Sequence, residues 1–224
     1  MRVKICGVVT PADALAAVEA GADLIGFNFV PESKRFISLE EAEAIHEALS
    51  DVEVETVALF RNATQDEVAK VLNVLLFDWV QFHGEESPED VARIEFPAIK
   101  ALRGADPEEA ARFSNAVLLL DHPVESGGGG QDWDWSAARG LIEQGREVIL
   151  AGGLHPGNVE AALRSLGGIL PWAVDVASGV ELDACKAPAD ADTRPDGKDP
   201  AKMKAFVKAV RAGESRNKGR EESA

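Results

Sequence analysis

Strand-like and helix-like segments alternate along this chain, and the alternation limits the possible folds more than any other feature of the sequence. Apolar runs with strand character lie at about 2–6, 24–29, 54–60, 79–83, 97–102, 116–121, 148–152 and 172–176. Segments with helical spacing and capping signals lie at about 11–22, 39–49, 64–75, 88–94, 107–113, 135–145, 156–166 and 200–210. Because a right-handed crossover through a helix returns the chain to the same edge of a sheet, this pattern predicts a parallel sheet.

The number of units distinguishes two kinds of parallel α/β architecture. A doubly wound open sheet accommodates the same alternation. Eight units within 224 residues fit a closed barrel better, since about 200 to 250 residues are needed to close one. We therefore expect a single-domain (β/α)8 barrel over residues 1–212, an extended loop rich in Asp, Ala and Pro at 182–198, and a disordered tail at 213–224.

The chain is strongly acidic, with a net charge of −16 from 39 acidic and 23 basic residues. A surface field of this sign repels nucleic acid and anionic lipid, so we expect neither as a partner. The acidic residues are spread along the whole chain rather than gathered in a tail. We hypothesise that they adapt the protein to high intracellular salt, which screens such a field.

Signals for secretion and membrane insertion are missing from the sequence. Met1 is not followed by a signal peptide, and no run of about eighteen apolar residues occurs. We expect a cytoplasmic protein without a membrane partner, either a monomer or a homodimer. In that reducing compartment Cys6 and Cys185 are expected to be free thiols rather than a disulfide.

The turns after the strands are the candidates for function, because the active site of such a barrel lies at the carboxyl ends of its strands. Glycine-rich turns follow the seventh strand at Gly152 and Gly153 and the eighth at 175-DVASG-179. Glycine lets backbone N–H groups approach an anion, so we expect a phosphorylated small-molecule ligand here; the alternative is that these glycines only permit tight turns. The tract 127-GGGG-130 is expected to form a lid, with a plain linker as the alternative.

A thiol and a carboxylate are the candidates for proton transfer. Asp121 ends an apolar strand, where burial would raise its pKa and make it a general acid. Cys6 ends the first strand, where nearby cations would favour its thiolate and let it act as a base. Each has a structural alternative, a turn cap for Asp121 and a core residue for Cys6. Lys34 and Arg35 suit a substrate carboxylate, or are simply solvated.

Neither a metal nor a dinucleotide is expected. His46 lies in a helical segment, while His83, His122 and His155 lie on three different loops, without the paired spacing of a zinc site. No GxGxxG motif follows the first strand, so a dinucleotide is not indicated.

A series of motifs runs in order through nearly the whole chain: 4-KICG-7, 21-GAD-23, 26-GFNFVPESKRFIS-38, 81-QFHGEE-86, 119-LLD-121, 134-DW-135, 152-GGLHPGNV-159, 174-VDVASGVE-181 and 198-KDPAKMKAFV-207. In this combination the chain resembles the phosphoribosylanthranilate isomerase family of tryptophan biosynthesis. The resemblance implies a ribulose-phosphate-binding barrel. It also implies an aldose–ketose isomerase that converts N-(5′-phosphoribosyl)anthranilate to 1-(2-carboxyphenylamino)-1-deoxyribulose 5-phosphate by an Amadori rearrangement, without a cofactor.

The resemblance further implies roles for single residues. Asp121 matches the general acid that protonates the ribose ring oxygen, and Cys6 matches the general base that removes the C2′ proton. Arg35 matches the residue that holds the anthranilate carboxylate. The other residues expected to bind the substrate are His83, Gly152, Gly153, Asp175, Ala177, Ser178 and Gly179.

Departures from the family pattern and rival functions remain. Gln131 stands where a lysine is common after the glycine tract, and Ala177 where a serine is common, which bears on binding strength rather than on reaction type. Cys185 leaves open an oxidative bond to Cys6. One rival is the related isomerase of histidine biosynthesis, which would have an aspartate in place of Cys6. The other is a non-catalytic phosphosugar-binding barrel, which loss of Cys6 or Asp121 would have favoured.

Overall fold

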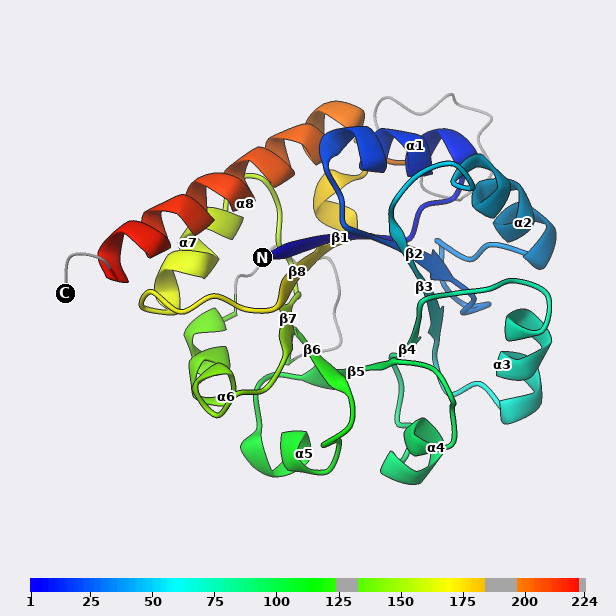
Figure 1. Ribbon diagram of the computed structural model, residues 1–224, viewed down its shortest axis with the longest axis horizontal. Coiled ribbons are helices and arrows are strands. Elements are labelled where there is room, and N and C mark those ends of the chain that lie inside the picture. Colours follow the sequence, from blue (N-terminus) through cyan, green and yellow to red (C-terminus); the bar gives the residue numbers. More distant parts are fainter. Residues whose placement is uncertain (124–132, 184–196, 222–224) are drawn as a thin grey trace.

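Eight parallel strands close into a barrel in which each strand pairs with its neighbours in sequence order and β8 pairs with β1 (Figure 1). The computed structural model describes residues 1–123, 133–183 and 197–221. The strands are β1 (Arg2–Cys6), β2 (Leu24–Asn28), β3 (Glu55–Phe60), β4 (Trp79–Phe82), β5 (Ala98–Arg103), β6 (Val117–Asp121), β7 (Val148–Leu150) and β8 (Ala173–Val176). The predicted (β/α)8 barrel is confirmed.

Helices surround the barrel and cover its outer face (Figure 1). They are α1 (Pro11–Ala20), α2 (Leu39–Ala48), α3 (Gln65–Leu72), α4 (Pro88–Ala92), α5 (Pro107–Ala111), α6 (Arg139–Glu143), α7 (Val159–Ser165) and α8 (Pro200–Glu221), with short 3-10 helices η1 (Trp135–Ala138) and η2 (Ser178–Val180). Local sequence explains where they start. Thr10, for example, caps α1 by accepting a hydrogen bond from the Asp13 backbone, ahead of a proline at the first helical position.

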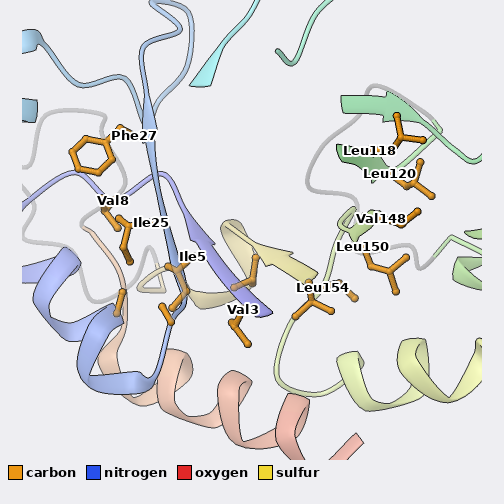
Figure 2. Close-up of a cluster of buried hydrophobic side chains, with 14 of the residues drawn as sticks. Val3, Ile5, Val8, Ile25, Phe27, Leu118, Leu120, Val148, Leu150 and Leu154 are labelled. Atoms are coloured by element: carbon orange, nitrogen blue, oxygen red, sulfur yellow. The ribbon is translucent and has the colours of Figure 1, made fainter. Parts of the chain in front are cut away.

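Strand alternation divides the core into two layers. On β1, Val3 and Ile5 point outward and pack with side chains of the neighbouring strands beneath the helices (Figure 2). A smaller apolar cluster fills the barrel interior and consists of Leu24, Val57, Ile99, Ala101, Val117, Leu119, Ile149, Ala151 and Ala173. Lys4 and Cys6 alternate with the outward pair and therefore face the interior.

The amino-terminal end of the barrel is closed by aromatic and charged side chains. The rings of Trp79 and Trp172 meet edge to face with centroids 5.3 Å apart, and the Arg2 guanidinium lies 4.5 Å from the Trp172 ring centre. Glu55 accepts hydrogen bonds from Arg2 and from the Trp79 indole. With this end filled, the opposite end, where the strands terminate, is the one available to a ligand.

Several predicted boundaries differ from the structure. β7 ends at Leu150, two residues early, because Gly152 and Gly153 adopt positive φ angles of 78° and 80°. α8 continues through Glu221, so a helix rather than a frayed tail occupies 213–221. At Gly213 the helix lies close to α7, since a Cβ there would be 2.9 Å from the Leu163 side chain.

The predicted lid at 127–130 and most of the loop at 182–198, including Cys185, lie outside the described residues. The two ends of that loop are joined by an antiparallel bridge between Glu181 and Lys198. Within the described part of the chain, no helix has both the length and the apolar character needed to cross a bilayer.

Candidate active site

The carboxyl ends of the strands bring the predicted thiol and carboxylate to one mouth of the barrel. Cys6 is the last residue of β1 and Asp121 the last residue of β6. A pocket of about 720 Å³ opens over the ends of β3 to β6, and Asp121 and His83 both line it. Parallel strands share one direction, so the side chains at their carboxyl ends lie at the same end of the barrel although the sequence separates them widely.

Cys6 is almost fully buried, with 5% of its surface exposed, and packs with Val30 and Leu59. Gly26 is its register partner on β2, and a Cβ at that position would lie 2.8 Å from Cys6 Sγ. Glycine at position 26 therefore leaves the space that the thiol occupies. The sequence interpretation placed position 26 in a strand and assigned it no role.

Lys4 lies beside Cys6 on the inner face of β1 and is completely buried. Its ammonium donates to Asp175 Oδ1 of β8 at 2.6 Å. Burial lowers the pKa of Lys4, but the charges of Asp175 and Cys6 and hydrogen bonds to both raise it to about 12. Lys4 is thus a permanent cation next to the thiol, and Asp175, expected to bind substrate, is engaged with Lys4.

Asp121 is held by two donors. His83 Nε2 lies 3.1 Å from Asp121 Oδ2, and the His122 backbone N–H donates to Asp121 Oδ1 at 2.7 Å. Burial raises the pKa of Asp121, but the hydrogen bond and charge of His83, with the His122 backbone, outweigh it and leave the pKa below its usual value. The prediction of a raised pKa is therefore wrong, because sequence alone did not place His83 against the carboxylate.

Arg35 lies across the turn that follows Cys6. A Cβ at Gly7, whose φ is 70°, would collide with the Arg35 side chain, so Gly7 makes room for the arginine. Arg35 Nε donates to Glu181 Oε1 at 2.5 Å, and Lys34 Nζ donates to Glu181 Oε2 at 3.0 Å. Burial raises the pKa of Glu181, but Arg35, Lys198 and Lys34 lower it overall, so the carboxylate is ionised.

Lys198 is a second buried lysine at this mouth, with 3% of its surface exposed. Its ammonium donates to the Ala177 carbonyl at 3.0 Å and lies 3.6 Å from Glu181 Oε1. Burial lowers its pKa to about 8, although the charges of Glu181 and Cys6 oppose the shift. Lys198 opens the 198–207 motif, but the sequence assigned it no role, because its partners come from the other side of the 182–198 loop.

The turns after β7 and β8 lie against each other. A Cβ at Gly179 would collide with the Leu154 carbonyl, so only glycine permits this contact. Asn158 braces the first turn, donating to the Gly153 carbonyl at 3.0 Å and accepting from the His155 backbone at 2.8 Å. The predicted residues Gly152, Gly153, Ala177, Ser178 and Gly179 therefore lie on two adjoining turns.

Two tryptophans fix the strand end ahead of Gly152. The indole N–H groups of Trp133 and Trp135 both donate to the Ala151 carbonyl, at 3.1 and 3.0 Å. A Cβ at Gly152 would lie 2.7 Å from Trp133 Nε1 and 3.1 Å from Asp121 Oδ1. Glycine at 152 thus separates the β7 turn from the carboxylate of Asp121.

Polar residues after β3 and β4 brace the loops on which they lie. Glu86 accepts from the Asn62 backbone at 2.7 Å and from Lys100 Nζ at 2.8 Å, and it is buried. Asn62 Oδ1 accepts from the Glu85 backbone at 2.7 Å. Among the residues described, no group of three or more His, Cys, Asp or Glu side chains is arranged to hold a metal ion.

These features define a class: a (β/α)8 barrel enzyme with a thiol, a carboxylate and buried lysines at the carboxyl ends of its strands. A family model described as N-(5′-phosphoribosyl)anthranilate (PRA) isomerase matches residues 3–209. The chain belongs to this family, and it is an isomerase of tryptophan biosynthesis.

Individual relatives cover almost the full length. An N-(5′-phosphoribosyl)anthranilate isomerase of Pseudomonas fluorescens is 42% identical over 220 residues, which are 94% of this chain and 96% of the relative. That of Myxococcus xanthus is 38% identical, with 95% and 97% covered. The crystal structure of phosphoribosyl anthranilate isomerase from Thermotoga maritima superimposes with a TM-score of 0.82 at 36% identity, covering 95% of this chain and 99% of that one.

A further solved structure of the family holds a ligand. It is a phosphoribosyl anthranilate isomerase in complex with reduced 1-(o-carboxyphenylamino)-1-deoxyribulose 5-phosphate. It aligns with a TM-score of 0.79 and 34% identity, and 95% of this chain and 99% of that chain are covered.

Proposed function

We propose that Asp121 and Cys6 are the general acid and general base with which this chain converts N-(5′-phosphoribosyl)anthranilate to 1-(2-carboxyphenylamino)-1-deoxyribulose 5-phosphate. The observation that carries the assignment is the meeting of a buried thiol and a hydrogen-bonded carboxylate at one barrel mouth, from strands on different sides of the barrel. Support comes from the solved relative that holds the reduced product.

The proposed chemistry consists of two proton transfers within one substrate. A proton passes from the Asp121 side to the ribose ring oxygen, the C1′–O bond breaks, and a Schiff base forms with the anthranilate nitrogen. The Cys6 thiolate then takes the C2′ proton, the electron pair moves into the C1′–C2′ bond, and the resulting enolamine tautomerises to the ketone. Substrate and product are isomers, so the scheme calls for no external oxidant or reductant.

Electrostatics support the role of Cys6 as a base. Lys4, kept charged by Asp175, is buried beside the thiol and places a fixed positive charge next to the sulfur. Lys198 adds a second ammonium whose charge interacts with Cys6. We therefore assign the role of base to Cys6, because two buried lysines lie close enough to interact with it. Lys4 comes from the same strand, and Lys198 is the last residue of the 182–198 loop.

Substrate binding is proposed to divide between two groups of residues. Arg35, oriented by Glu181, would pair with the anthranilate carboxylate through the rest of its guanidinium. The adjoining turns after β7 and β8 would hold the phosphate through backbone N–H groups at Gly152, Gly153, Ala177, Ser178 and Gly179. Asp175 contributes through Lys4 rather than by a direct contact.

The activity test adds purified protein to freshly made phosphoribosylanthranilate and follows the loss of its fluorescence. We expect loss well above the spontaneous rate, and a fall in kcat of about 10²-fold or more for Cys6→Ser and for Asp121→Asn. The exposed-residue variant Lys208→Met is the matched control and should keep parental turnover. Loss at the background rate would contradict the activity, and parental turnover in either variant would contradict that assignment.

We propose a cytoplasmic location, which suits an acidic enzyme of amino-acid biosynthesis with a reduced thiol. The functional unit is proposed to be a monomer or a homodimer. A solved relative from Thermotoga maritima is described as dimeric, with engineered monomers. Light scattering at micromolar protein concentration would distinguish the two states.

A further inference from the structure

Gln81 begins a chain of hydrogen bonds that ends at Asp121. Its side chain is 1% exposed and projects into the barrel from β4. Gln81 Nε2 lies 2.9 Å from His83 Nδ1, and His83 Nε2 lies 3.1 Å from Asp121 Oδ2. An amide nitrogen can only donate, so in this arrangement His83 Nδ1 accepts, and the imidazole proton lies on Nε2, directed at Asp121.

The other end of the Gln81 amide is unusual. Gln81 Oε1 is buried and has no hydrogen-bond partner among the described residues. A half-turn of the amide would place Oε1 against His83 Nδ1, where it would accept a hydrogen bond from a protonated Nδ1. Because Oε1 has no bond to lose, this rotation keeps one hydrogen bond to His83 and exchanges an unpaired buried oxygen for an unpaired buried amide nitrogen.

The two orientations fit the two protonation states that a general acid needs. With Nε2 of Gln81 toward the ring, the His83–Asp121 pair is a neutral imidazole and a carboxylate. With Oε1 toward the ring, the pair carries one additional proton, either as imidazolium and carboxylate or as Nδ1–H imidazole and carboxylic acid. Only the second state has a proton to give to a substrate oxygen.

We propose that Gln81 is a positioning residue that supports both protonation states of the His83–Asp121 pair by turning its side-chain amide. The proposal rests on the assignment of Asp121 as the general acid. It accounts for a carboxylate whose pKa is held down by His83 and which must nevertheless deliver a proton. The Gln81 side chain contacts His83, so Gln81 would act on Asp121 through His83.

Other charged groups share the pocket with the pair. Glu86 and Lys100 form a buried ion pair at 2.8 Å and largely cancel. The remaining charged or titratable side chains that line the pocket are Arg61, Glu85, Arg103, Glu109, Arg112 and His122. Substitutions at position 81 leave all of these charged groups unchanged. A difference between the parent and a variant therefore reports the effect of the Gln81 amide.

The decisive measurement is nuclear magnetic resonance on the ¹⁵N-labelled protein without substrate. A hydrogen bond between Gln81 Nε2 and His83 Nδ1 transmits a nitrogen–nitrogen coupling, which an N–H to oxygen bond does not. We expect this coupling when the His83–Asp121 pair lacks the additional proton and its disappearance when the pair gains that proton, because Nδ1 is then protonated in either form. A coupling that persists through the titration, or that is missing at every pH, would overturn the proposal.

Two variants extend the test. Gln81→Glu keeps only acceptors, so the ratio of imidazolium to neutral His83 at a fixed pH should rise about tenfold or more. Gln81→Met has similar length but offers neither donor nor acceptor, and we expect kcat to fall about ten- to a hundredfold with KM changed much less. An unchanged ratio in the first, or parental kcat in the second, would contradict the role of Gln81.

These measurements distinguish a failure of the Gln81 proposal from a failure of the proposed isomerase function on which it rests. The coupling and the His83 ratio are measured in the free protein, so they report on Gln81 even if no turnover is found. A lack of turnover in the parent with a normal coupling would remove the isomerase assignment only. If Gln81→Met fails to fold, as judged by circular dichroism, the parent coupling and Gln81→Glu still decide the question.

Discussion

Lys198 shows at the scale of one residue how the fold constrains a charge. The ammonium is buried, and its pKa of about 8 lies below the usual 10.5. Between these two pH values the unfolded chain binds the proton more tightly than the folded one. The contribution of Lys198 to the free energy of unfolding therefore rises as pH increases from about 8 to 10.5. It is lowest at a pH where Lys198 is fully protonated.

The corresponding prediction compares the parent with Lys198→Met in denaturant unfolding at several pH values. Relative to the variant, the parent should gain up to about 3 kcal/mol of unfolding free energy across that window, from the size of the pKa shift. Lys208→Met, at an exposed position on α8, is the control and should follow the parent. Parallel curves for parent and Lys198→Met would refute the assignment.

Individual site residues were predictable from the sequence where a strand end alone determines their place. Cys6 and Asp121 follow apolar runs, and their arrival at one mouth follows from the closed barrel. The partners that set their charge were not predictable. Lys4 pairs with Asp175 and His83 with Asp121 across strands far apart in sequence, and whether burial or a neighbour controls a pKa depends on distances that only the folded chain has.

At the scale of elements, the turn after β7 determines whether Asp121 can keep its position. Gly152→Ala adds a Cβ at 2.6 Å from the His122 backbone nitrogen and 3.1 Å from Asp121 Oδ1, at a φ of 78°. We expect a loss of about 1 to 3 kcal/mol of stability and a steep fall in kcat, because the turn and the carboxylate both have to move.

Gly145→Ala is the matched control for this substitution. Gly145 has a φ of 81°, but nothing lies within 4 Å of a Cβ there. It should show the backbone cost in thermal melting and keep parental kcat. Equal kcat in both variants would mean that Gly152 has no part in placing Asp121.

The sequence predicted which segments are helices and which are strands, because the spacing of apolar residues and the capping residues agree. The exact ends of these segments depend on tertiary contacts. The end of α8 shows this. Residues 213–224 read as a polar tail, yet the helix continues through Glu221, and at Gly213 it lies close to Leu163 on α7. Likewise α7 begins at Val159 rather than at 156, since Asn158 first bonds to the His155 backbone.

At the scale of the whole molecule, the net charge of −16 predicts that stability depends on salt concentration. Acidic side chains spread over the surface repel one another, and the repulsion falls as the screening length falls from about 10 Å at 0.1 M salt to about 3 Å at 1 M. We expect the Tm to rise between dilute buffer and molar KCl, as measured by calorimetry. A Tm that stays constant or falls would contradict the hypothesis of salt adaptation.

The four tryptophans of the chain fall into two pairs at opposite ends of the barrel. Trp79 and Trp172 lie at the closed end, whereas Trp133 and Trp135 bond to the strand end beside Asp121. Their emission therefore combines two local signals. Replacing Trp79 and Trp172 by phenylalanine would leave an optical reporter of the active site, whose light an anthranilate ring bound nearby would absorb, so that ligand occupancy becomes visible as energy transfer.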